Sequence, residues 1–420
     1  MKIRSITCFL DPGWPLERSR LQRAEVFREA ALQAFQAAGY EVQTTRLATP
    51  PFPRLLQENF SQAEAQALSQ ELESAAAQAG FAYLSLGPAQ PEFPVSFTWI
   101  PQLIAATQNV FFAGSLTDGE GRISLVAVRA CAEVIQRTAS IAPDGFANLR
   151  FAALANVSPG TPFFPAAYHA ADPPAHRGRD FMAFALATEA ADLAVQAFGQ
   201  AGSLAEARQK LVGAVETHAA RMEQIASDLA AQFGLGFNGI DFSSAPFPER
   251  ELSVGEALER LGAPAVGAPG ALAAAAILTE AIDRARFERV GFSGLFLPVL
   301  EDAVLAQRAA EGWLTVKDLL LYSAVCGTGL DTVPLPGDVS QAALQAVLLD
   351  VAVLACRLDK PLTARLMPVP GKKAGDPIGF DFAYFAPSRV MALDAPPLTG
   401  VLAGDESFSL ATRRPPIRRS

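Results

Sequence analysis

The amino-acid sequence predicts an α/β protein in which largely parallel strands are covered by helices. Short apolar runs with the character of strands alternate along the chain with longer amphipathic segments of helical periodicity. Consecutive parallel strands need a crossover connection, usually a helix, so this alternation favours a parallel sheet with helices outside it. Half of the 420 residues are hydrophobic and 18% are charged, which suits a large buried core.

The strands are expected where short apolar runs stand between turn residues. In chain order these segments are 3–10, 41–47, 81–86, 110–113, 151–157, 180–188 and a last segment near 364–368. The helices are expected over 16–38, 63–78, 123–137, 191–198 and 204–233, and then over 254–261, 271–286, 302–311, 316–326 and 341–360. Gly39 follows the first of them, at a position where glycine commonly ends a helix.

No linker rich in proline, glycine or serine divides the chain. We therefore expect one α/β domain over residues 1–400, followed by a basic tail over 401–420 that contains proline and arginine and is poorly ordered.

The composition excludes several classes of function. A formal charge of −9 argues against nonspecific binding to nucleic acid or to anionic lipid. Three histidines and four widely spaced cysteines argue against a metal centre and a disulfide scaffold, so we expect no cofactor and a reducing, cytoplasmic location. No run reaches the roughly 18 apolar residues of a membrane-spanning helix. The expected partner is a small-molecule substrate, and a homo-oligomer is possible.

The proline-rich loop over 156–180 is the first candidate for chemistry, because it lies between two predicted strands. Its prolines restrict the backbone and can hold His169 in one place, where an imidazole serves as a general acid or base. Tyr168 beside it is a candidate substrate contact. The alternative is that His169 only hydrogen-bonds the backbone of a packed loop.

Carboxylates supply the next candidates. Glu189 follows an apolar strand, and ligands collect at the carboxyl ends of parallel strands; it could equally be a first-turn residue of the following helix. Asp241 lies in a polar loop with Ser243 and Ser244, which are candidate substrate contacts. The alternative for Asp241 is a turn or cap residue, and no nucleophile-elbow motif surrounds either serine.

The C-G-T-G-L-D segment over 326–331 brings a thiol, two glycines and a carboxylate together. Cys326 could be a nucleophile, Asp331 an acid, base or hydrogen-bond acceptor, and Thr328 a substrate contact. Buried cysteines are often inert, so a purely structural Cys326 stays open.

Several of these motifs, in this order, resemble one protein family. They are MKIRSIT at the start, TPFFPAAYH over 161–169, G-x-D-x-S-x-A-P over 239–246, GFSGLFLPVLED over 291–302 and CGTGLD over 326–331. Together they resemble the uncharacterised bacterial and archaeal family called domain of unknown function seven-one-one, over about residues 1–395. The resemblance implies a fold similar to that of the pyruvate formate-lyase-like glycyl radical enzymes, whose ten-stranded α/β barrel consists of two five-stranded parallel halves.

Glycyl radical chemistry does not follow from this resemblance. Those enzymes carry R-V-x-G and an aromatic residue near the C-terminus, together with a cysteine inside the barrel. The string R-V-G-F over 289–292 lacks the intervening residue and lies about 130 residues before the end of the chain. A radical at Cys326 would therefore have no storage site.

The sequence thus predicts a non-radical, metal-independent enzyme that uses His169, Glu189, Asp241 and Asp331 in acid–base chemistry. The expected substrate is small, oxygen-rich and carbohydrate-like, and the expected reaction is hydrolysis or elimination, because paired carboxylates catalyse both without a cofactor. Two alternatives stay open. One is an enzyme with Cys326 as nucleophile and His169 as its base, and the other is a non-catalytic sensor that binds a small metabolite.

Overall fold

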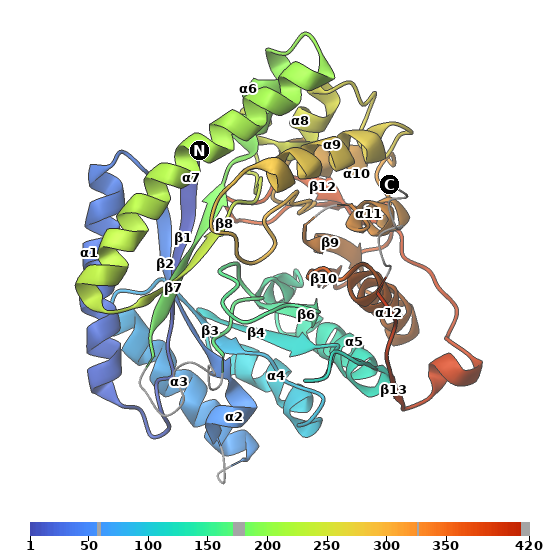
Figure 1. Ribbon diagram of the computed structural model, residues 1–420. Helices are drawn as coiled ribbons and strands as arrows, with labels where there is room; N and C mark the ends of the chain where they lie inside the picture. The colour runs from blue at the N-terminus through green and yellow to red at the C-terminus, as the bar shows by residue number, and fades with distance from the viewer. Residues whose placement is uncertain (57–59, 171–180, 326, 413–420) are drawn as a thin grey trace.

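The computed structural model describes residues 1–56, 60–170, 181–325 and 327–412. Within these ranges the centre of the molecule is a nine-stranded sheet with helices around it (Figure 1). The strands, in their order across the sheet, are β8 (Gly236–Asp241), β7 (Ala183–Glu189), β1 (Lys2–Phe9), β2 (Val42–Pro51), β3 (Tyr83–Gly87), β4 (Val110–Ser115), β6 (Phe151–Ala155), β10 (Leu362–Val369) and β9 (Gly329–Pro336). The predicted α/β class is confirmed.

The sheet consists of three blocks of parallel strands. The middle block, β1, β2, β3, β4 and β6, is parallel throughout. On one side β7 pairs antiparallel with β1, and on the other β10 pairs antiparallel with β6; β8 and β9 are parallel to β7 and β10 respectively. The amino ends of the middle strands therefore lie at the same edge of the sheet as the carboxyl ends of β7 and β10.

The helices connect and cover the strands. They are α1 (Arg18–Ala37), α2 (Phe52–Leu56), α3 (Gln62–Gln78), α4 (Val95–Ala106), α5 (Leu125–Ala139), α6 (Ala191–Gly199), α7 (Leu204–Phe233), α8 (Val254–Arg260), α9 (Ala271–Arg284), α10 (Ala303–Ala310), α11 (Val316–Ser323) and α12 (Gln341–Leu358). The longest, α7, begins after a Ser203 hydroxyl that accepts from the Glu206 backbone N–H and ends at the left-handed Gly234. Both signals are visible in the sequence, and the predicted bounds of this helix match.

The closed ten-stranded barrel that the resemblance implies is not confirmed. In the described sheet β8 and β9 are the two edge strands, and the segment 288–300 runs between them. This segment forms only isolated bridges, from Arg289 to β8 and from Pro298 to β9. Its backbone is not regular strand, because Gly291 and Ser293 have positive φ and Pro298 cannot donate a hydrogen bond.

Two strands, β8 and β9, lie where the sequence predicted polar loops. The sequence of β8, GFNGID, contains two glycines and an asparagine, and that of β9, GLDTVPLP, contains two prolines. Both compositions disfavour strands. Proline is tolerated in β9 because this strand pairs with only one neighbour of the described sheet. Asp241 and Asp331 therefore stand on strands, not on loops.

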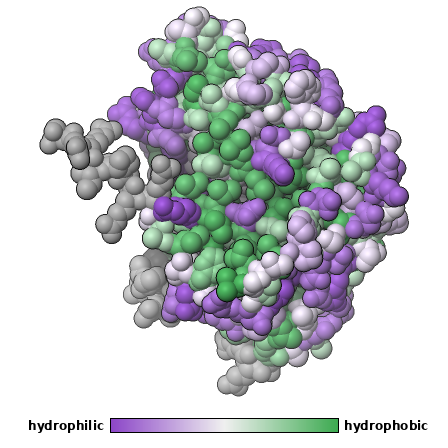
Figure 2. Space-filling view, turned by 90° about the vertical axis from the view of Figure 1, so that its right-hand side faces the viewer, coloured by the Kyte–Doolittle hydropathy of each residue, from purple (hydrophilic) through white to green (hydrophobic). Residues whose placement is uncertain are grey.

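One helix of the described residues, α12, is long and apolar enough to span a membrane by length and composition alone. Its buried residues, among them Leu344 and Leu348, pack toward α5, β6 and β10. The C-terminal segment crosses its far end, where Arg357 donates to the Ala411 carbonyl at 2.6 Å. Apolar residues form a band across the side of the molecule that carries α12 (Figure 2). Packing on the sheet buries 44% of this helix.

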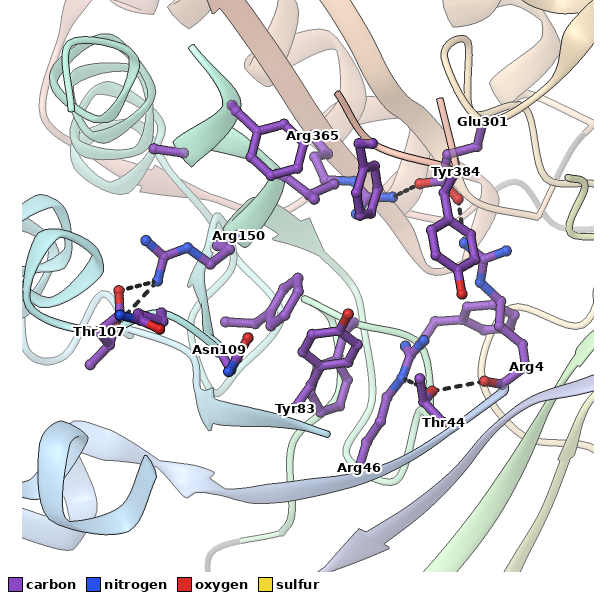
Figure 3. A pocket seen from close by; sticks show the side chains of 18 of the residues that line it. Arg4, Thr44, Arg46, Tyr83, Thr107, Asn109, Arg150, Glu301, Arg365 and Tyr384 are labelled. Atoms are coloured by element: carbon purple, nitrogen blue, oxygen red, sulfur yellow. Dashed lines mark hydrogen bonds and ion pairs between the residues drawn. The ribbon is translucent and has the colours of Figure 1, made fainter. Parts of the chain in front are cut away.

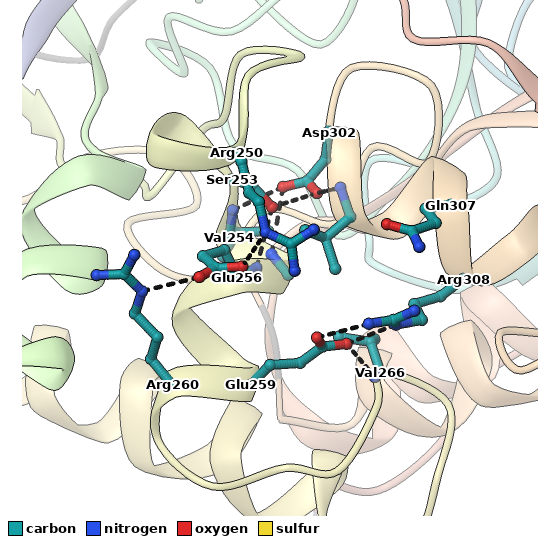
Figure 4. Close-up of polar contacts among 12 residues, drawn as sticks. Arg250, Ser253, Val254, Glu256, Glu259, Arg260, Val266, Asp302, Gln307 and Arg308 are labelled. Atoms are coloured by element: carbon teal, nitrogen blue, oxygen red, sulfur yellow. Dashed lines mark hydrogen bonds and ion pairs between the residues drawn. The ribbon is translucent and has the colours of Figure 1, made fainter.

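Asp302 joins two helices in the C-terminal part of the fold. Its Oδ1 accepts from the backbone N–H groups of Val304 and Leu305, at the start of α10, and from the Ser253 hydroxyl. Its Oδ2 accepts from the Val254 N–H at the start of α8 (Figure 4). A single buried carboxylate thus satisfies N–H groups of two helix starts.

The last described residues still belong to the fold. The strand β13 (Ser407–Phe408) pairs antiparallel with β5 (Ile123–Ser124). The predicted tail over 401–420 therefore has an ordered first part, because β13 falls within it. The rest of the predicted tail, 413–420, lies outside the described residues.

Candidate active site

A cavity of about 460 Å³ opens at the edge of the sheet where the middle strands begin. Thr44 and Tyr83 line it from the starts of β2 and β3, and Asn109 lines it immediately before β4. Arg4 of β1 and Arg365 of β10 also point toward it (Figure 3). Ligands usually bind at the carboxyl ends of parallel strands. Here the cavity lies at the amino ends of the middle block, and the reversed strands bring their carboxyl ends to the same place.

Five charged side chains, only 4–13% exposed, form one continuous ion-pair network. Arg4, Glu301 and Arg365 of this network line the cavity, and Glu189 and Asp331 lie behind them. Glu301 lies at its centre, between Arg4 and Arg365: Arg4 Nη1 is 3.3 Å from Glu189 Oε2, and Arg4 Nη2 contacts Glu301. Arg365 donates from Nη2 to Glu301 Oε1 at 2.8 Å and from Nε to Asp331 Oδ1 at 2.5 Å. Each carboxylate therefore contacts a guanidinium, which compensates much of the cost of burying it.

The three carboxyl groups of the network differ in acidity. Burial raises the pKa of Glu301, but the charges of Arg4 and Arg365 outweigh it and hold this pKa below the usual value. The pKa of Glu189 is raised by burial, although Arg4 opposes the shift. Burial also raises the pKa of Asp331 against the charge of Arg365. The central carboxylate is thus held ionised, and the two outer groups retain a proton more readily.

Arg46 is the buried cation of the cavity that stands outside these ion pairs. Its Nε donates to Thr44 Oγ1 at 2.9 Å, and its guanidinium carbon lies 5.8 Å from the ring centre of Tyr83 and 5.2 Å from that of Phe164. Among the described residues no carboxylate accepts a hydrogen bond from it. Burial, and next the charge of Arg4, lower the pKa of Arg46 to about 9. A negative charge beside this side chain would be stabilised.

A fourth arginine, Arg150, lies on another side of the cavity (Figure 3). Its Nη1 and Nη2 donate to the carbonyl oxygens of Thr107 and Ile104, at 2.8 and 2.7 Å. These carbonyls end α4, and a cation at a helix C-terminus is favourable. Arg150 therefore stabilises the C-terminus of α4, and both of its Nη atoms already donate to carbonyl oxygens there.

The chain matches one family model over most of its length. Residues 1–382 match the model described as uncharacterised ACR (DUF711). The chain belongs to this family. A UPF0210 protein of Pyrobaculum islandicum is 31% identical over 389 residues, which are 87% of this chain and 82% of that protein. The family resemblance seen in the motifs is confirmed, and the fold similarity to glycyl radical enzymes is not.

Other relatives in the family align over shorter stretches. A UPF0210 protein of Pyrobaculum arsenaticum is 37% identical over 283 residues, 65% of this chain and 59% of that protein. One of Pyrobaculum aerophilum is 38% identical over 268 residues, 60% of this chain and 56% of that protein. The chain thus spans less than two thirds of the length of these two curated relatives.

Of the four acid–base residues predicted from the sequence, the structure brings Glu189 and Asp331 into one network. Glu189 is the last residue of β7, as its predicted place at a strand end requires, and Gln43 Nε2 donates to its Oε2 at 2.5 Å. Asp331 projects from β9 toward Arg365. Two intervening arginines and Glu301 connect the two predicted carboxylates.

Asp241 lies in a different part of the fold, where it holds the family segment 291–302 in place. Its Oδ1 accepts from Ser243 Oγ at 2.6 Å and from the Ser293 N–H at 2.7 Å, and its Oδ2 accepts from the Phe292 N–H at 2.7 Å. Burial raises its pKa to about 6, although these hydrogen bonds favour the charged form. Ser244 donates toward the Gly294 carbonyl at 3.4 Å. These contacts fit the alternative of a turn-organising aspartate.

His169 and Tyr168 are packed in their loop. The His169 ring lies between Phe9 and Phe181, with Nε2 3.1 Å from the Phe181 carbonyl oxygen. The Tyr168 hydroxyl donates to the Val157 carbonyl at 2.7 Å, and burial raises the Tyr168 pKa to about 12. Among the described residues, neither side chain lines the arginine cavity.

Of the remaining candidates, Cys326 lies outside the described residues. Thr328 is buried, and its carbonyl oxygen accepts from the Thr363 N–H at 2.7 Å. Its hydroxyl has no hydrogen-bond partner within the part of the chain that the structure describes. Its role as a substrate contact stays a prediction.

The sequence analysis did not single out Arg4, Arg46, Arg365 or Glu301. A usable signal was present, because each arginine interrupts an apolar strand: KIRSITCF, TTRLATPP and TARLMPV. A lone charge in a buried strand must be paired or functional. Glu301 similarly ends the apolar run of GFSGLFLPVLED.

Proposed function

We propose that this chain binds a small, oxygen-rich anion in the arginine-lined cavity. The observation that carries the proposal is Arg46, a buried guanidinium that faces the cavity without a carboxylate partner among the described residues. Guanidinium groups bind carboxylates and phosphates through paired N–H donors. Within the described ranges of the chain, Arg46 donates only from Nε, so its Nη donors face the cavity without an acceptor there.

The charge of the neighbouring network supports this proposal. Arg4 and Arg365 face three carboxyl groups, two of which have raised pKa values. When one of these outer groups keeps its proton, the network is neutral. Arg46 then adds one positive charge to a cavity in which water is partly excluded, where charge interactions are stronger than in solvent.

A second candidate function is acid–base catalysis on the same anion, by hydrolysis or elimination and without a radical or metal. The presence of Glu189 and Asp331 in one network favours it. Carboxyl groups with raised pKa values can donate a proton near neutral pH, and the ionised Glu301 lines the cavity. Glu189 and Asp331 are the proposed proton donors. The alternative of a nucleophilic Cys326 remains a second enzymatic proposal.

We also propose that the segment 288–300 completes a barrel of the glycyl-radical-enzyme type, supported by its bridges to both edge strands.

A cytoplasmic location is proposed because Cys8, Cys131 and Cys356 are free thiols, as expected in a reducing compartment. The net charge of −9 supports a small-molecule partner over nucleic acid or membrane. A homo-oligomer is also proposed.

Calorimetric titration with acetate and with inorganic phosphate tests anion binding. We expect binding by the native chain and an affinity lowered about 10- to 100-fold in Arg46→Gln, since a hydrogen bond to a charged group contributes about 1.5–3 kcal/mol. Arg286→Gln is the matched control, because the Arg286 side chain is 90% exposed and pairs with Glu216 on the surface. Equal affinities in native chain, control and Arg46→Gln would rule out the proposed anchor.

Catalysis is tested separately once an anion that binds has been found. Product formation is followed by chromatography in the native chain, in Glu189→Gln and in Asp331→Asn. We expect both variants to lose turnover while they still bind the anion. Full turnover in both would exclude their role as proton donors, and turnover lost only in Cys326→Ala would favour the thiol.

A further inference from the structure

Part of the lining of the arginine cavity is aromatic. Phe163 and Phe296 contribute two rings whose centres are 4.4 Å apart. Phe382 packs against Phe146 at 5.1 Å and against Tyr384 at 5.2 Å between ring centres. These five side chains all line the cavity, and we call them the aromatic wall.

Part of this wall is supplied by a separate hairpin. The strands β11 (Pro377–Ile378) and β12 (Ser388–Arg389) pair antiparallel, and Phe382 and Tyr384 lie in the connection between them. Both side chains remain half-buried, whereas Phe385 of the same connection is buried in a cluster with Met367 and Val390. The hairpin is therefore anchored by Phe385 and presents two of its rings to the cavity.

The cavity is much larger than the anion that the arginines can bind. Its volume of about 460 Å³ falls within the range of about 300–1,000 Å³ that is typical of small-molecule sites. Arg46 also borders aromatic surface, because its guanidinium lies over Tyr83 and Phe164, two further rings that line the cavity. A ligand held there by an oxyanion would place its remaining atoms against aromatic rings.

We propose that the ligand is an amphipathic oxyanion: a carboxylate or phosphate bound by Arg46 and joined to a flat, apolar body that packs against the aromatic wall. This inference rests on the proposed function and narrows its ligand class. Aromatic faces favour offset or edge-on contact with another ring, in addition to the area that such a contact buries. Phe382 is the residue that determines this preference, since it lines the cavity, is only half-buried and contacts two other members of the wall.

The test compares two pairs of anions that differ only in their body: acetate with benzoate, and inorganic phosphate with phenyl phosphate. Dissociation constants are measured by calorimetry on the native full-length chain. We expect each aryl anion to bind about 30-fold more tightly than its compact counterpart, equivalent to about 2 kcal/mol. In Phe382→Ala this ratio should fall below about fivefold, and in Phe382→Leu it should take an intermediate value. A urea unfolding curve establishes that each variant is folded.

The outcomes separate this inference from the function on which it rests. Aryl and compact anions that bind equally well through Arg46 would overturn the amphipathic ligand and leave anion binding intact. An aryl preference that persists in both Phe382 variants would overturn the role of this residue. No binding of any of the four anions would remove the proposed function and the inference together. A preference confined to one pair identifies whether the oxyanion is a carboxylate or a phosphate.

Discussion

Glu301→Gln provides the sharpest test of the ion-pair network. Glu301 contacts both Arg4 and Arg365, and its side chain is only 6% exposed. The substitution keeps the size of the side chain but removes the charge that both guanidinium groups share. Removing one partner of a buried ion pair typically costs about 3–5 kcal/mol. Because Glu189 and Asp331 still pair with the two arginines, we expect about 3 kcal/mol of lost unfolding free energy.

The chain contains a matched surface control for this substitution. Glu280 also contacts two arginines, Arg208 and Arg284, but its side chain is 39% exposed. Exposed ion pairs contribute about 0–1 kcal/mol, so Glu280→Gln should change the unfolding free energy by less than 1 kcal/mol. Urea unfolding followed by circular dichroism measures both variants, and an unchanged slope with denaturant indicates that the compared states are the same.

Anion binding gives a second readout that a general loss of packing would not produce. Glu301→Gln makes the network more positive by one charge, which a bound anion can compensate. Benzoate should therefore bind Glu301→Gln more tightly than the native chain, and at a concentration 100 times its dissociation constant it should restore about 2.7 kcal/mol. Losses of equal size in Glu301→Gln and Glu280→Gln, or weaker anion binding by Glu301→Gln, would refute the assignment of the network.

Two further predictions concern the framework. Asp302→Ala should lower the unfolding free energy measured in urea by about 3 kcal/mol, since it leaves N–H groups at the starts of α8 and α10 without an acceptor. Ser61→Ala, which removes the exposed cap of α3, should cost only about 1 kcal/mol. Similar costs in the two variants would contradict the role of Asp302 as a cap shared by two helices. The native pKa of Asp241, about 6 against its usual 3.8, means that its contribution to stability is fully present below pH 4 and is lost as the pH rises through 6. The unfolding free energy should therefore fall by about 3 kcal/mol between pH 4 and 7, and this pH-dependent loss should be absent in Asp241→Asn. Identical pH profiles of the native chain and Asp241→Asn would contradict the raised pKa.

Much of the framework could be predicted from local sequence signals. The alternation of apolar runs with amphipathic segments indicated most strands of the middle block, and cap residues such as Ser203 and Gly234 marked the ends of α7. The strands β8 and β9 could not be recognised in this way, because glycine and proline in their sequences have poor intrinsic strand propensity. Their conformation is set by pairing with β7 and β10, which is tertiary information.

Only part of the candidate site could be predicted from the sequence, again because the rest depends on tertiary contacts. A search for carboxylates near predicted strand ends found Glu189, and a polar segment indicated Asp331. It could not indicate that an antiparallel arrangement of strands brings both residues to Arg4 and Arg365, since strand direction is not encoded in the apolar pattern of any one strand. Asp241 met the same sequence criteria, but its hydrogen bonds are directed to a neighbouring loop.

The ion-pair network also has a consequence for the order of folding. Arg4 and Glu301 are 297 positions apart, and Arg365 comes later still in the chain. Contacts over such separations form late, because the entropy of closing the loop between them must be lost first. During synthesis, Arg4 emerges long before the residues that neutralise it. Anion binding should therefore report on completed folding: a refolding chain should acquire most of its helical circular dichroism before it can bind benzoate.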